Sequence, residues 1–110
     1  MADEPRLSFW ASIGPTFRRV EKVAAERVEE LHWLPDEKLV TKFKEPCTEV
    51  LTDHRGRRYE AEISVSCEGR DLELTISVAD LPRRRALVGD GFVRRDGVTC
   101  GHKMLLYFRD

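Results

Sequence analysis

The stretch Arg58–Val78, RYEAEISVSCEGRDLELTISV, decides the fold because apolar and polar residues alternate along it in two unbroken runs. The apolar positions are Tyr59, Ala61, Ile63, Val65 and Cys67 in the first run, and Leu72, Leu74, Ile76 and Val78 in the second. Only a strand points alternate residues to opposite faces, so the stretch predicts a half-buried antiparallel hairpin. Gly69-Arg70 separates the runs, and glycine at the first central position is typical of a type II′ turn. Such a turn would place Ile63 opposite Ile76 on the apolar face.

A helix is predicted on the N-terminal side of this hairpin, from Pro15 to about Trp33. Apolar residues there recur at intervals of three and four, which is the spacing of one helical stripe. The stripe consists of Phe17, Val20, Ala24, Val28 and Leu31. Proline suits the first turn of a helix, and Pro35 biases Leu34 away from helical geometry, so the helix should end there. Residues 3–13 suit either a short helix or an edge segment.

Further strands are predicted on both sides of the hairpin. Residues 39–43 alternate weakly, and Thr48 to Asp53 predicts a strand with Val50 pointing inward. Residues 83–93 should include another strand. The last apolar stretch, residues 104–108, is apolar on both faces and is therefore expected at the centre of the sheet.

The fold class that follows is α+β. We expect an N-terminal amphipathic helix packed on a curved antiparallel β-meander of about five or six strands, because strands joined by short turns pair in chain order. A partly closed barrel that grips the helix is the alternative geometry. The length of 110 residues suits a single domain, residues 1–110.

Composition places few limits on function. The formal net charge is −1, so bulk charge predicts neither a nucleic-acid nor a membrane partner. The charge is nevertheless uneven, since residues 1–80 hold 12 Lys+Arg and 17 Asp+Glu while residues 81–110 hold 7 and 3. The first six residues are charged and do not resemble a signal peptide. With three cysteines, an odd number, the simplest expectation is a cytoplasmic chain with free thiols.

Residues capable of catalysis or metal binding form no recognisable pattern. Cys100-Gly101-His102 supplies soft ligands, but zinc sites normally show paired short spacings, and only one such spacing is present. Cys100 and His102 would point to the same side of a strand, which is compatible with a nucleophile and its base but is an unspecific arrangement. We therefore expect no metal site, no cofactor and no catalytic residue.

Arginine clusters are the strongest candidates for a binding site. They comprise Arg55, Arg57 and Arg58 around a glycine turn, and Arg83, Arg84 and Arg85 after Pro82. Guanidinium groups match the geometry of phosphate. The hairpin register would bring both clusters to the same end of the sheet, with Asp53, Asp80 and Asp90 as possible counter-charges. No aromatic residue is interleaved with the arginines, so a nucleic-acid partner is not favoured.

The interpretation that best fits these features is a non-enzymatic, cytoplasmic protein-interaction domain, such as a regulatory or inhibitor (immunity-type) protein. Its partner would be another protein or a second copy in a homodimer, and no membrane is expected. The alternative is an anion- or nucleotide-binding module that uses the Arg-rich turns. A small enzyme with a site inside a curved sheet is the third reading.

Overall fold

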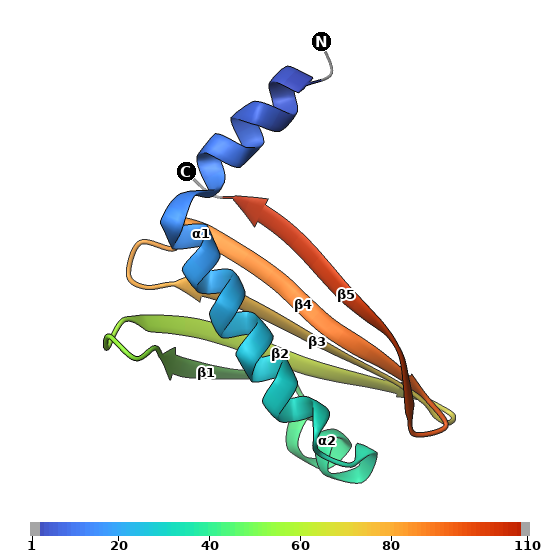
Figure 1. The fold of residues 1–110 in the computed structure, drawn as a ribbon. Helices are drawn as coiled ribbons and strands as arrows, with labels where there is room; N and C mark the ends of the chain where they lie inside the picture. The colour runs from blue at the N-terminus through green and yellow to red at the C-terminus, as the bar shows by residue number, and fades with distance from the viewer. Residues whose placement is uncertain (1–2, 109–110) are drawn as a thin grey trace.

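The computed structural model describes the backbone of residues 3–108 and the side chains of residues 14–101. Over this range two helices precede five strands: α1 (Asp3–His32), α2 (Asp36–Phe43), β1 (Cys47–Thr52), β2 (Arg58–Glu68), β3 (Asp71–Asp80), β4 (Ala86–Arg95) and β5 (Val98–Phe108). The strands form one antiparallel sheet in the order β1-β2-β3-β4-β5. The predicted α+β class and antiparallel meander are thus confirmed, with five strands in an open sheet (Figure 1).

The central hairpin has the predicted register. Ile63 lies opposite Ile76 and Cys67 opposite Leu72 in the β2–β3 pair. Gly69 has a φ of 63°, whereas Arg70 does not take a positive φ, and this combination of signs is that of a type II′ turn. The alternation of the sequence therefore specifies both the strands and the turn that joins them.

Helix α1 covers one face of the sheet and packs mainly on β3 and β4 (Figure 1). Its predicted stripe is buried throughout: Phe17, Val20, Ala24, Val28 and Leu31. Of the two structures expected for residues 3–13, the helix is the one that forms, so α1 starts at Asp3 and bends at Gly14, whose φ of 53° and ψ of −171° are not helical. Pro15 follows the bend, so the predicted start marks a kink inside a longer helix.

The core lies between α1 and the apolar sheet face. The strands contribute Tyr59, Ala61, Ile63, Leu72, Leu74, Ile76, Val78, Ala86, Val88 and Phe92, all buried. Each large side chain removed from water in this way stabilises the fold by about 1.5–3 kcal/mol. The opposite face is polar at its centre, with Ser64, Ser66, Thr75 and Ser77. No helix within residues 3–108 covers that face (Figure 1).

The predicted strand at residues 39–43 is wrong, since Asp36–Phe43 forms helix α2. Leu39 and Phe43 are both buried, and a spacing of four suits one face of a helix as well as one face of a strand. Asp36 and Glu37 in the first turn complement the helix dipole. A segment this short does not distinguish the 3.6-residue repeat of a helix from the two-residue repeat of a strand.

Two predictions about the strands at the sheet edges are also wrong. Val50 of β1 was expected to point inward, yet it is 57% exposed, because the alternate set, which includes Leu51, faces the core. The last strand was expected at the sheet centre, but β5 pairs only with β4 among the described strands. A meander that follows chain order necessarily leaves its last strand at an edge.

Candidate functional site

The two arginine-rich segments lie at the same end of the sheet, as the hairpin register indicated. The Leu81 N–H donates a 3.0 Å hydrogen bond to the Arg58 carbonyl, which joins the β3–β4 connection to the start of β2. A cavity of about 280 Å³ opens beside them. It is called the basic cavity below, and the arginines that line it are Arg19, Arg57, Arg58, Arg83 and Arg85.

Two of the six predicted binding residues lie outside the basic cavity. Arg55 is exposed on the β1–β2 turn and does not line it. Arg84, whose φ of 52° is in the left-handed region, forms an ion pair with Glu60. Arg84 therefore differs from its neighbours Arg83 and Arg85, which line the cavity. The sequence pattern gives no reason to distinguish the three arginines.

Asp53 organises the β1–β2 turn beside the cavity. Its Oδ1 accepts hydrogen bonds from the backbone N–H groups of Arg55 (2.9 Å) and Arg57 (3.0 Å). Its Oδ2 accepts from the Arg57 Nε at 3.1 Å and from the Tyr59 hydroxyl at 2.7 Å. The Tyr59 hydroxyl, then Arg57 and the two backbone donors hold the pKa of the Asp53 carboxyl well below its ordinary value, although partial burial opposes them. Burial, and secondly Asp53, raise the pKa of Tyr59.

The three aspartates expected beside the arginines have different roles. Asp53 is the one that pairs with an arginine of the cavity, Arg57. Asp80 lines the cavity, but its Oδ1 accepts a 2.8 Å hydrogen bond from the Ala86 N–H. Asp90 is buried in β4, opposite Ile76, so it does not belong to this end of the sheet.

Sequence reasoning missed Arg19 as a member of the basic cavity. Arg19 comes from α1, and its Nη2 donates a 3.2 Å hydrogen bond to the Thr16 hydroxyl one turn earlier. The available signal was its position near the start of a predicted helix, where a cation opposes the helix dipole. That signal indicates another use for the charge, but the partner depends on how α1 crosses the sheet.

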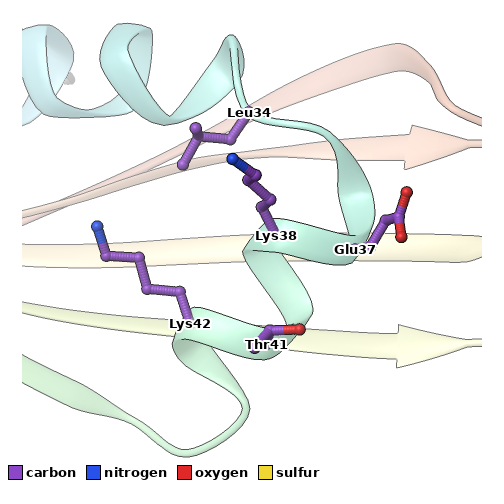
Figure 2. Close-up of a pocket in the computed structure, with 5 residues that line it drawn as sticks. All are labelled: Leu34, Glu37, Lys38, Thr41 and Lys42. Atoms are coloured by element: carbon purple, nitrogen blue, oxygen red, sulfur yellow. The ribbon is translucent and has the colours of Figure 1, made fainter.

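A second hollow lies along helix α2 and was not predicted. It has a volume of about 620 Å³ and is lined by Leu34, Glu37, Lys38, Thr41 and Lys42, which together are called the α2 groove below. Figure 2 shows Lys38 and Lys42 extending towards the side of Leu34, whereas Glu37 extends away from them. Neither lysine forms an ion pair with any side chain of residues 14–101. The groove thus combines an apolar wall with two lysines that are not paired with a described carboxylate, and the Lys42 Nζ lies 5.7 Å from the centre of the Phe43 ring.

Trp33 is the residue before Leu34 in the chain, and its side chain is 76% exposed. The backbone on both sides of it is fixed by the Arg94 side chain, which is 6% exposed. Arg94 donates hydrogen bonds to the carbonyl of His32 and, at 2.9 Å, to that of Leu34. A further bond of 2.7 Å joins Arg94 to the Asp36 carboxylate.

His32 and Arg94 pack around the same aromatic ring. The His32 ring meets Phe92 edge-on at 5.4 Å, and the Arg94 guanidinium lies 4.8 Å from the centre of that ring. The His32 Nε2 is 2.8 Å from the Thr99 hydroxyl. The turn between α1 and α2 is therefore fastened to β4 and β5, and Trp33 projects from a fixed base.

The cysteines and histidines form no site among the side chains that the structure describes. Cys47, Cys67 and Cys100 are free thiols, and no group of three or more metal-binding side chains occurs within residues 14–101. The His102 side chain lies outside the described residues, so the Cys100–His102 arrangement is not tested. Cys67 holds its predicted register but is exposed at the hairpin end.

Comparison with known proteins gives no further guide to the activity. No protein-family model matches the chain, and no curated protein or solved structure matches it significantly. Among the described helices, none is both long and apolar enough to cross a membrane.

Proposed function

We propose that the protein is a non-enzymatic, cytoplasmic interaction domain that binds an acidic, partly apolar segment of another protein through Trp33 and the α2 groove. A regulatory or inhibitor protein would use a surface of this kind. The observation that carries the proposal is the contrast at Trp33, which combines an exposed side chain with a fixed backbone.

Exposure of a fixed tryptophan favours binding for two reasons. Tryptophan is among the residues most often responsible for interface affinity, because its large apolar ring gains much when it is covered. The backbone at Trp33 is already ordered by Arg94, so less conformational entropy is lost on association.

The charges of the α2 groove indicate the chemistry of the partner. Lys38 and Lys42 are one helical turn apart and extend to the same side, and Leu34, the next residue after Trp33 in the chain, provides the apolar wall of the groove. Carboxylates placed on these lysines would steer association, and an apolar anchor would cover Trp33 and Leu34. An acidic amphipathic segment meets both requirements.

The proposed compartment follows from the cysteines. All three thiols are free, and exposed free thiols persist more readily in a reducing compartment than in an oxidising one. Cys67 and Cys100 are both exposed, so they would be open to oxidation outside the cytoplasm.

Selection from a random peptide library displayed on phage tests the proposal. We expect the selected peptides to combine Asp or Glu with an aromatic or large aliphatic residue. A selected peptide, synthesised with a fluorescent label, should bind Trp33→Ala roughly thirtyfold more weakly by anisotropy, since truncating an interface tryptophan costs about 2 kcal/mol or more. The double change Lys38→Glu and Lys42→Glu should remove the preference for acidic peptides.

Val50→Ala is the matched control, because Val50 is another exposed apolar residue but belongs to β1. It should bind the peptide as the wild type does. Selected peptides without acidic residues, or unchanged binding by Trp33→Ala, would contradict the proposal. Light scattering at twice 12.7 kDa that reverts to the monomer in Trp33→Ala would make a second copy the occupant, which also overturns it.

A further inference from the structure

The basic cavity holds more positive charge than its surroundings compensate. Five arginines line it, and Asp80 is the carboxylate among its lining residues. That carboxylate already accepts a hydrogen bond from the Ala86 N–H. Nearby, Asp53 pairs with Arg57. The lining therefore carries a net positive charge even after both aspartates are counted.

Four of the five arginines at the cavity lack an ionic partner among the described side chains. Arg19, Arg58, Arg83 and Arg85 form no ion pair with any side chain of residues 14–101. Arg84, in the same chain segment, does form one with Glu60. Arg84, which does not line the cavity, is thus paired with a carboxylate, whereas its neighbours Arg83 and Arg85, which do line it, are not.

The backbone that carries these arginines is ordered. The Arg84 N–H donates to the Asp80 carbonyl at 2.8 Å, and the Leu81 N–H donates to the Arg58 carbonyl at 3.0 Å. Arg57 is held by its bond to Asp53 and Arg19 by its bond to Thr16. The five arginines thus line one cavity on an ordered backbone, and because like charges repel, an anion in that cavity would relieve the repulsion among them.

The size of the cavity limits the anion. Sites that enclose an entire cofactor or drug-sized ligand have volumes of about 300–1,000 Å³, so a cavity of about 280 Å³ suits a small group. Guanidinium forks donate paired hydrogen bonds to oxyanions such as phosphate and carboxylate, and the higher charge of phosphate suits a lining with several arginines. We propose that the basic cavity is a binding site for a phosphate group, either inorganic phosphate or the phosphate of a small phosphomonoester.

Isothermal titration of the full chain with inorganic phosphate, with adenosine 5′-monophosphate and with adenosine tests this inference. Phosphate and the monophosphate should bind, and adenosine should not. Equal affinities for the two would identify free phosphate as the source, and tighter binding of the monophosphate would identify a nucleotide. Binding of adenosine without binding of phosphate would overturn the proposal.

The structure supplies closely matched variants. Arg85→Ala should weaken phosphate binding roughly tenfold or more, because it removes charged hydrogen-bond donors. Arg55→Ala should change it less than about twofold, since Arg55 is exposed but lies outside the cavity. Arg83→Lys keeps the charge but loses the fork, so it should bind with intermediate affinity. Equal losses in Arg85→Ala and Arg55→Ala would show general attraction to a basic surface and would refute the site.

Salt dependence provides an independent measurement on the unmodified chain. Raising the ionic strength from about 0.1 M to about 1 M shortens the Debye length from about 10 Å to about 3 Å, so phosphate affinity should fall. Chemical shifts should move at Arg19, Arg83 and Arg85 on addition of phosphate, and not at Trp33. Shifts confined to other residues would contradict the inference even if phosphate binds.

Discussion

The guanidinium of Arg94 donates a 2.9 Å hydrogen bond to the carbonyl of Leu34, across a separation of 60 residues in the chain. It also bonds the His32 carbonyl and the Asp36 carboxylate. These acceptors belong to the end of α1, the following turn and the start of α2. One buried side chain of β4 thereby satisfies backbone groups that a helix end leaves without intrahelical partners.

Arg94→Ala should destabilise the fold by about 3 kcal/mol, because it leaves at least two carbonyls and a carboxylate without their donor. Arg94→Lys should recover part of the loss, since a single ammonium cannot reach three acceptors with fork geometry. Urea unfolding followed by circular dichroism measures both. Arg95→Ala is the control, as the neighbouring side chain is exposed, and it should change the free energy of unfolding by less than about 0.5 kcal/mol. Equal effects of Arg94→Ala and Arg95→Ala would contradict this role.

Asp53 should make stability depend on pH. Its pKa in the folded protein is lower than in the unfolded chain, so its contribution is fully present above the unfolded value of about 3.9 and is lost as the pH falls towards the folded value. Asp53→Asn removes that titration. The variant should be less stable at neutral pH, and its stability should fall less steeply in acid than that of the wild type.

Urea midpoints measured between about pH 2 and about pH 7 check the pH prediction. Tyr59→Phe provides the matched comparison, because it deletes the donor that contributes most to the low pKa of Asp53. Its acid limb should lie between those of the wild type and Asp53→Asn. Parallel acid limbs in all three proteins would show that Asp53 does not contribute in this way.

The central hairpin could be predicted in full because its information is local. The alternation assigns faces, and Gly69 assigns the turn, so the pairing of Ile63 with Ile76 follows from neighbours in the chain. The stripe on α1 is equally local. Helix α2 was mistaken for a strand because positions 39 and 43 share a face in both structures and the segment is too short to distinguish them.

The binding surfaces could be predicted only in part for the same physical reason. The hairpin register brings the two arginine turns together, so their meeting follows from local pairing. The contribution of Arg19 depends on the crossing of α1 over the sheet, which no local pattern encodes. The fixed backbone at Trp33 likewise depends on the bonds from Arg94, 61 positions later in the chain.

The buried face of the hairpin should dominate stability. Ile63 and Ile76 are both 0% exposed, so replacing either with alanine should cost about 2–5 kcal/mol of unfolding free energy. Glu62 precedes Ile63 in β2 and pairs with Ser77, but it is exposed on the other face, and Glu62→Ala should cost less than about 0.5 kcal/mol. Urea melts of the three variants measure these free energies of unfolding. A larger loss of stability in Glu62→Ala than in either isoleucine variant would reverse the assignment of the faces.

Gly91 should be the least replaceable glycine of the sheet. A Cβ on Gly91 would lie 2.1 Å from the Leu74 carbonyl oxygen and 3.1 Å from the carbonyl carbon. Because those atoms belong to the backbone of β3, they cannot rotate away as a side chain could, and Gly91→Ala should cost about 3 kcal/mol or more. Gly101 in β5 is the matched control, since a Cβ there would meet no atom within 4 Å. Gly101→Ala should keep the urea midpoint of the wild type, and a Gly91→Ala midpoint as high as that control would mean that β3 and β4 are not in such close contact.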